Sequence, residues 1–179
     1  MEALRTRRAC RQFTPQPVAR HLIEELIAAA VLAPSGMNQQ PWGFVVVSDA
    51  GRVHELGQDA KNQAVRHFQS NRHLRDHLAD PALEIFHGAP ALILICATVQ
   101  TEFSVQDCCL AAENLMLAAR ALGLGTCWIG LAGPWSNLAE TKARLGAPAD
   151  WTVVAPIIVG HPQAQPSPTP RNKPATIWA

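Results

Sequence analysis

The hydrophobic positions of this chain change between helical and strand-like spacing along its length. Between residues 18 and 32, apolar residues recur three and four apart, which predicts an amphipathic helix that ends before Pro34. A more uniformly apolar helix is predicted at 106–122, ended by the glycines that follow. Short apolar runs predict strands at 44–47, 91–96, 126–129 and 152–159. Helices that alternate with short strands indicate an α/β or α+β sandwich.

The remaining segments are patterned less clearly. Residues 50–79 are polar, rich in Gln and His and weakly helical, and residues 135–145 predict another helix. Pro156 predicts that the last strand lies at a sheet edge or a bulge, because proline has no N–H to donate. The proline-rich residues 162–179 predict an extended arm. Because this arm ends in Ile177-Trp178, we expect it to pack on a surface, most simply on a second copy of the chain.

Composition narrows the class of protein. The 179 residues contain 15 Lys and Arg against 14 Asp and Glu, for a formal net charge of +1. That length predicts a single domain over residues 1–179, and the charge argues against a nucleic-acid or membrane-surface binder. The apolar runs are too short to span a bilayer, and the basic start does not resemble a signal peptide. Five cysteines without a Cys-x-x-Cys motif favour a reducing compartment, so we expect a cytoplasmic protein.

The near-neutral total conceals a basic start. Five of the 12 arginines lie in the first 20 residues. Arg7, Arg8 and Arg11 are close enough in sequence, within about one turn, for two guanidinium groups to converge on one anion. Arg171 and Lys173 in the arm offer a second half for such an anion site. The alternative is a solvated basic end.

Two further segments carry candidate binding groups. Residues 33–42 place Ser, Asn and two Gln between two prolines, a set that fits the rim of a flat heterocycle, although turn formation around a buried Trp42 explains part of it. The glycines of segment 123–130 follow a helix and precede a strand, the reverse of a Rossmann turn, so no dinucleotide-binding domain of that type is expected. Gly130 still allows backbone amides to approach a cofactor.

Two other clusters are poorer candidates. His73 and His77 have the i, i+4 spacing of metal ligands but lack a third ligand nearby, so we expect a solvated helix face. Cys108 and Cys109 lie in the most apolar helix, where a buried thiol is inert.

Taken in order, these segments resemble the FMN-dependent nitroreductase family. The matching stretches are Arg7 to Phe13 with Pro17-Val18, Ala33-Pro34-Ser35, Asn38, Gln40-Pro41-Trp42, Asp107 to Ile129, Pro156 to Pro162, and Arg171. The resemblance implies an α+β fold with a central, mostly antiparallel sheet flanked by helices and a C-terminal arm on the partner subunit. It also implies a homodimer with FMN at the interface. Residues 58–87, where family members build substrate-covering helices, match no pattern.

The resemblance further implies which residues hold the cofactor. Arginines would hold the phosphate and ribityl chain: Arg7, Arg8, Arg11 and Arg171. Residues from the other subunit would contact the ring or ribityl groups: Pro34, Ser35, Asn38 and Gln40. Backbone groups near the ring would come from Trp128, Ile129 and Gly130. Ala9 stands where the family usually has Ser, so it keeps only its backbone contact.

The implied reaction is a ping-pong cycle in which NADH or NADPH gives a hydride to flavin N5 and a small-molecule acceptor, such as a nitroaromatic or a quinone, then takes it. No side-chain acid or base is required, and we name no catalytic residue. Two alternatives stay open. The same fold and cofactor could serve reductive dehalogenation or oxygen-dependent chemistry. A basic arm could instead bind RNA or DNA, although it is short and lacks an aromatic stacking platform.

Overall fold

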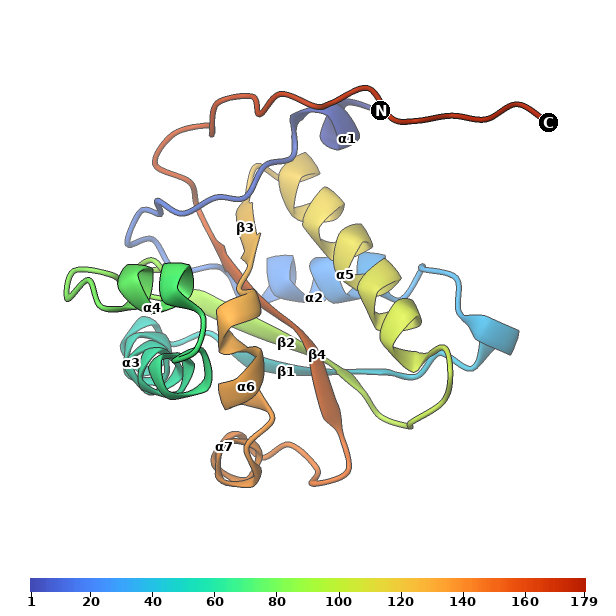
Figure 1. Ribbon diagram of the computed structural model, residues 1–179. Coiled ribbons are helices and arrows are strands. Elements are labelled where there is room, and N and C mark those ends of the chain that lie inside the picture. The colour runs from blue at the N-terminus through green and yellow to red at the C-terminus, as the bar shows by residue number, and fades with distance from the viewer.

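The computed structural model describes residues 1–179 and arranges them as a four-stranded sheet with helices on both faces (Figure 1). The strands are β1 (Trp42–Val47), β2 (Ala91–Ala97), β3 (Gly125–Trp128) and β4 (Thr152–Gly160). Their order is β1-β2-β4-β3, and every neighbouring pair is antiparallel. This arrangement confirms the predicted α+β fold with an antiparallel sheet between helices.

The helices follow the predicted pattern with three differences. Their bounds are α1 (Glu2–Thr6), α2 (Arg20–Ala30), α3 (Ala50–His67), α4 (Arg72–Leu78), α5 (Ser104–Ala121), α6 (Gly133–Ser136) and α7 (Ala139–Leu145), with 3-10 turns η1 (Gly36–Asn38) and η2 (Gly130–Ala132). The helices predicted at 18–32 and 106–122 are α2 and α5. Helix α1 was not predicted, and residues 50–79 divide into α3 and α4 at Asn71, whose side chain accepts from the Leu74 N–H at 3.1 Å.

The single helix predicted at 135–145 is wrong, because the chain breaks between α6 and α7. The Asn137 side chain donates to the Val153 carbonyl at 2.9 Å and accepts from the Val153 N–H at 2.8 Å. These two bonds tie the end of α6 to β4. Leu138 then takes an extended conformation, which no helix can continue through.

Strand β2 lies at the centre of the core and is buried along its whole length. Leu92 and Leu94 face a cluster that includes residues of α3 and α6, whereas Ile93 and Ile95 face a cluster that includes residues of α2 and α5. Each of these four side chains is at most 1% exposed, and burying one stabilises the fold by about 1.5–3 kcal/mol. The sheet is therefore covered on both faces.

Pro156 lies in β4, which has β2 on one side and β3 on the other, so the predicted edge position is wrong. Strand β4 does contain a bulge, at Val154, where the register with β2 shifts between the Ile95–Ala155 and Cys96–Val153 pairs, but Pro156 itself pairs in register with Leu94. Strand β3 pairs only with Ile157–Gly160. Beyond its end, the Ile129 N–H donates to the Pro156 carbonyl at 2.8 Å. The N–H that Pro156 lacks would point to this same side, toward the Ile129 carbonyl, which accepts from the Ala132 N–H at 3.0 Å instead.

The basic start runs alongside β3 as an extended segment, so Arg7, Arg8 and Arg11 do not lie within a single turn as expected. Ala9 forms a parallel bridge with Thr126, whose carbonyl accepts from the Cys10 N–H at 2.8 Å. Gly125 makes this approach possible, because a Cβ there would stand 2.7 Å from the Cβ of Cys10.

The arm begins beside this segment and then runs across the surface near α1 (Figure 1). Phe13 bridges Pro162, and the Gln163 N–H donates to the Gln12 carbonyl at 3.0 Å. Residues 163–179 form no helix or strand, and Trp178 is 92% exposed. None of the helices combines the length and the apolar character needed to cross a membrane.

Candidate functional site

A hollow of about 640 Å³ opens where β3 ends. Its lining residues are Arg11, His77, Leu83, Ile85, His87, Cys127, Trp128, Ile129, Gly130 and Leu131. The structure thus brings together four of the predicted site residues, one basic and three from segment 128–130. The lining is apolar with three basic or imidazole side chains, and it contains no carboxylate. We call residues 7–13 and 128–130 the β3-side half of the candidate site.

The backbone of segment 128–130 is only partly free. Ile129 uses both of its backbone groups inside the fold, since its N–H donates to Pro156 at 2.8 Å and its carbonyl accepts from the Ala132 N–H at 3.0 Å. Gly130 has open space within 4 Å of the position a Cβ would take. Of the three residues predicted to contact the ring, Gly130 therefore offers the most accessible backbone.

The arginines of the start reach different partners. Arg7 Nε lies 3.2 Å from Glu113 Oε1 on α5. Arg8 Nη1 donates to the carbonyls of Arg5 at 2.9 Å and Arg7 at 2.6 Å, whereas Arg8 Nε is buried without a hydrogen-bond partner. A buried unpaired guanidinium donor is costly unless an acceptor reaches it. Ala9 is exposed and brings no side-chain donor, as expected.

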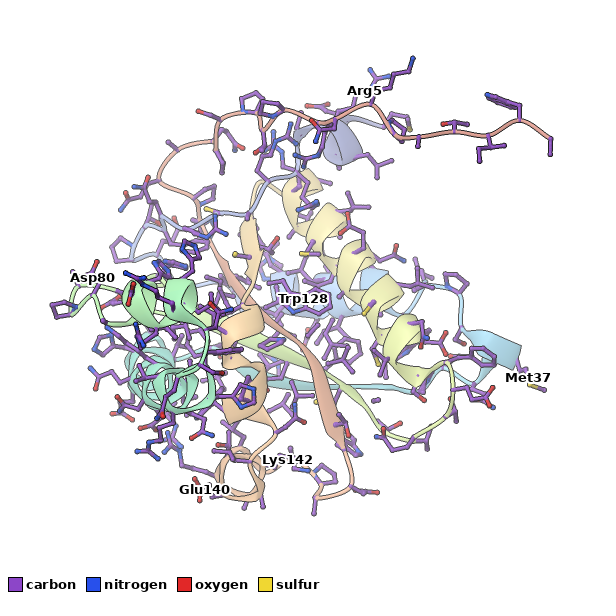
Figure 2. All side chains as sticks on the ribbon, in the orientation of Figure 1. Arg5, Met37, Asp80, Trp128, Glu140 and Lys142 are labelled. Carbon is purple, nitrogen blue, oxygen red and sulfur yellow. The ribbon has the colours of Figure 1, made fainter.

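The loop of residues 34–40, which we call the loop half, lies elsewhere. Figure 2 shows Met37 at the margin of the molecule, well away from Trp128. The loop is held by local bonds: Ser35 Oγ accepts from the Gln40 N–H at 3.0 Å, and Gln40 Nε2 donates to Asn38 Oδ1 at 3.1 Å. The first part of the loop is fixed to α5, because the Asp107 side chain accepts from the Gly36 N–H at 3.1 Å.

Backbone strain marks the loop half as well. Met37, Asn38 and Gln40 have φ between 49° and 53°, a left-handed backbone conformation that residues other than glycine rarely adopt. Strain of this kind concentrates at functional sites. Pro34, Asn38 and Gln40 are exposed. The loop therefore presents a fixed set of amide groups outward.

Arg171 is separate from both halves. It is exposed, and its guanidinium donates to the carbonyls of Thr169 and Pro170 in the arm itself, at 3.2 and 3.3 Å. Within one chain the predicted site residues thus form three groups.

The cysteines and the paired histidines behave as expected from the sequence. Burial raises the pKa of Cys96 to about 11 and that of Cys108 to about 12, so neither thiol is a nucleophile at neutral pH. His73 and His77 are both exposed on α4.

The sequence did not reveal that His77 and His87 line the hollow together. His87 is half-buried, and its pKa is lowered by burial, by Arg11 and by His77. Its φ of 52° turns the chain just before β2. A lone His before a Gly carries no signal of such a position.

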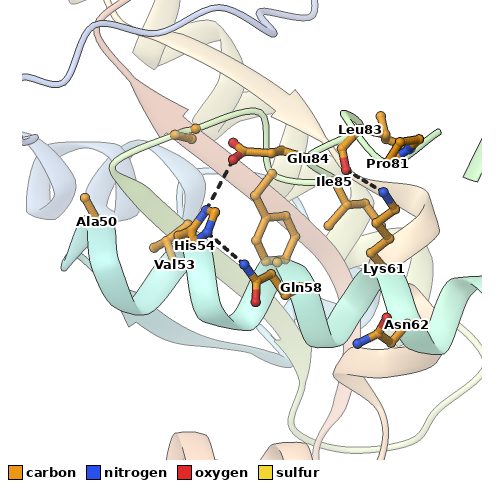
Figure 3. Close-up of a pocket in the computed structure, with 14 residues that line it drawn as sticks. Ala50, Val53, His54, Gln58, Lys61, Asn62, Pro81, Leu83, Glu84 and Ile85 are labelled. Atoms are coloured by element: carbon orange, nitrogen blue, oxygen red, sulfur yellow. Dashed lines mark hydrogen bonds and ion pairs between the residues drawn. The ribbon is translucent and has the colours of Figure 1, made fainter.

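A second cavity, of about 410 Å³, lies between α3 and residues 81–89 (Figure 3). Three of its polar side chains bond to other polar groups around the cavity. His54 Nδ1 lies 3.4 Å from Glu84 Oε1, and its Nε2 lies 2.9 Å from Gln58 Nε2. Lys61 Nζ donates to the carbonyls of Asp80 at 2.6 Å and Leu83 at 3.0 Å. These contacts anchor the segment that forms one wall of the hollow, since Leu83 and Ile85 line both spaces.

Comparisons with known proteins agree with this architecture. A model of the nitroreductase family matches residues 4–161. The 5,6-dimethylbenzimidazole synthase of Rhodospirillum rubrum is 32% identical over 89% of this chain and 80% of its own, and the FMN reductase (NADPH) of Bacillus subtilis is 30% identical over 90% and 65%. The crystal structure of a nitroreductase with bound FMN from Bacteroides fragilis superposes with a TM-score of 0.85 at 25% identity, over 99% of this chain and 97% of that one. This chain belongs to the nitroreductase family.

Proposed function

We propose that this protein is an FMN-dependent NAD(P)H oxidoreductase that acts as a homodimer. Membership of the nitroreductase family makes it a flavin oxidoreductase, and relatives named FMN reductase (NADPH) and NADPH-flavin oxidoreductase support a nicotinamide donor. FMN, when bound, accepts a hydride from NADH or NADPH at N5 and passes it to an acceptor such as a nitroaromatic or a quinone. The chain forms one domain, with residues 162–179 as an arm on the partner.

The residues present fit FMN. The observation that carries the proposal is the buried, partnerless Nε of Arg8, the residue before Ala9, which pairs with Thr126 of β3. An anionic oxygen would satisfy this donor, and Arg7 and Arg11 add positive charge nearby. We propose that these arginines and Arg171 hold the phosphate and ribityl chain, and that Ala9 contributes only its backbone. The apolar lining of the hollow suits a flat ring at Trp128, Ile129 and Gly130.

The loop half completes the site from a second copy. In one chain its amides, carried by Pro34, Ser35, Asn38 and Gln40, face outward and do not meet the hollow. Two leucines on one face of α5, which we call the α5 row, support pairing of two copies. Leu110 is 46% exposed, and Leu117, seven residues later, is partly buried. Phe103, at the start of α5, is 48% exposed and lies against Gly36 of the loop half.

The residues of this chain bind and orient the cofactor, the donor and the acceptor, and they exclude water. Donor and acceptor use the same hollow in turn, which gives ping-pong kinetics. Its apolar walls, formed by Leu83, Ile85 and Leu131, remove water from the face where hydride moves.

The test is the absorbance spectrum of the purified protein. We expect a flavin spectrum that NADH or NADPH bleaches and that an acceptor restores. Isolation without flavin, together with no uptake of added FMN, contradicts the proposal. An acceptor panel of a nitroaromatic, a quinone, an aryl halide and dioxygen then separates nitro and quinone reduction from dehalogenation and oxygen chemistry.

A further inference from the structure

Three basic or imidazole side chains converge on the hollow from separate parts of the chain. Arg11 comes from the extended start, His77 from α4, and His87 from the turn before β2. No carboxylate lines the hollow with them. The other lining residues are mostly apolar and suit the ring of a small aromatic molecule, so the hollow combines apolar and basic groups.

The wall that carries His87 is fixed rather than loose. Lys61 and His54 of α3 hold residues 80–84, as described above. Phe86 is 2% exposed and packs edge-on against Trp135, with ring centroids 5.9 Å apart. His87 follows directly, and its own N–H donates to the Glu84 carbonyl at 2.9 Å. The backbone that carries the imidazole is therefore held in place, which reduces the cost of ordering it on binding.

Three charged or titratable groups act on His87. Arg11 and His77 face it as basic groups, and Glu84 is the one acidic group that acts on it. Burial and the two basic neighbours lower the pKa of His87, so its imidazole is mainly neutral at pH 7 and gains charge as the pH falls. An anion bound between these groups relieves their repulsion and favours the charged imidazole.

We propose that His77 and His87 determine acceptor specificity by binding an anionic oxygen group, such as a carboxylate, on the aromatic electron acceptor. This rests on the proposed function for the reaction itself, but it assigns a role to residues that the cofactor does not require. Arg11 serves the flavin, whereas the two imidazoles select the molecule above it.

The kinetic test compares 4-nitrobenzoate with its neutral counterpart 4-nitrobenzamide. For the double variant His77→Asn with His87→Asn, we expect kcat/KM for the carboxylate to fall about tenfold through KM, because a hydrogen bond to a charged group is lost. The value for the amide stays unchanged. His73→Asn, on the same helix but outside the hollow, is the matched control and leaves both values unchanged. Equal losses for both acceptors, or a change confined to the KM of NADH, overturn the proposal.

The pH dependence gives a second kinetic readout. We expect the preference of the wild type for 4-nitrobenzoate to rise as the pH falls from 8 to 6, and that of the double variant to stay flat. The acceptor carboxylate remains ionised throughout this range, so the change reports on the protein. A preference in the wild type that does not vary with pH contradicts the role of the imidazoles.

A binding measurement separates this inference from the proposed function. NMR titration of the imidazole protons of the purified protein, with and without 4-nitrobenzoate, is expected to show a raised pKa for His87 in its presence and none with 4-nitrobenzamide. This readout needs no turnover, so it decides the inference even if NADH fails to bleach a flavin. An unchanged titration of both histidines overturns it.

Discussion

The two halves of the proposed FMN site are built in opposite ways. The β3-side half is embedded in the fold, since Cys10 and Phe13 are 2% and 6% exposed and Ala9 pairs with Thr126. The loop half projects outward, with Met37 88% exposed, and is shaped by its own hydrogen bonds. The β3-side half is therefore set by the folding of one chain, whereas the loop half is shaped locally and meets the β3-side half only in the proposed dimer.

The largest effect should come from breaking the contact between two copies. Leu110→Glu places a charge at the exposed position of the α5 row, and burying that charge in a dimer interface costs at least about 3 kcal/mol, or more than a hundredfold in dimer affinity. We expect a monomer that has lost FMN, because the loop half no longer meets the β3-side half. Sedimentation and FMN titration measure both.

The matched control for this variant is Val65→Glu on α3, on the other face of the sheet. Val65 is 37% exposed, so a charge there remains in water and should leave dimer and flavin unchanged. If Leu110→Glu stays dimeric and yellow, the α5 row is not the interface and the two halves do not meet through it.

The next largest effect should come from breaking the β3-side half within one chain. Gly125→Val puts a Cβ within 2.7 Å of Cys10 and 3.3 Å of Phe13, which forces the basic segment away from β3. Overpacking of this kind lowers the free energy of unfolding by about 1–3 kcal/mol. Urea unfolding checks this. Gly133→Ala, which meets no atom within 4 Å, is the control and should change stability by less than about 0.5 kcal/mol.

The same contrast explains how much the sequence could reveal. Local signals were sufficient for α2, α5 and the strands, because their hydrophobic spacing is a property of the segment itself. They were also sufficient to single out residues 34–40, where polar side chains gather between prolines. The extended course of residues 7–11 was missed, because it depends on pairing with Thr126, more than a hundred residues away. The same applies to the break at Asn137, which depends on β4.

Residues at the hollow show the same limit. Trp128 and Gly130 were found through resemblance of their whole segment to a family, whereas His77 and His87 were not. Their convergence arises from the packing of the wall against α3, which involves Lys61 and Glu84. None of these contacts has a sequence spacing that could have been read in advance.

A smaller effect should follow from loosening the loop half alone. Ser35→Ala removes the oxygen that accepts from the Gln40 N–H at 3.0 Å, a bond worth about 1 kcal/mol. We expect FMN to bind about fivefold more weakly, because the strained loop is less well preorganised. Isothermal titration with FMN measures this. Ser48→Ala, at an exposed position after β1, is the control, and an equal loss in both variants would show that the loop geometry is irrelevant to the flavin.

The smallest effect is a dependence of stability on pH. It distinguishes the hollow from the loop half, because the loop half contains no titratable side chain. The β3-side hollow contains His87, whose pKa is lowered in the folded protein by burial and by Arg11. The unfolded chain therefore binds a proton there more readily, at a pKa of about 6.5. The contribution of His87 to stability is complete above that value, declines as the pH falls through it, and levels off below the lowered pKa of the folded state. His87→Gln should flatten this part of the profile in urea unfolding between pH 8 and pH 5, whereas His21→Gln, on the exposed face of α2, should not. A profile unchanged by His87→Gln would place the acid sensitivity outside the hollow.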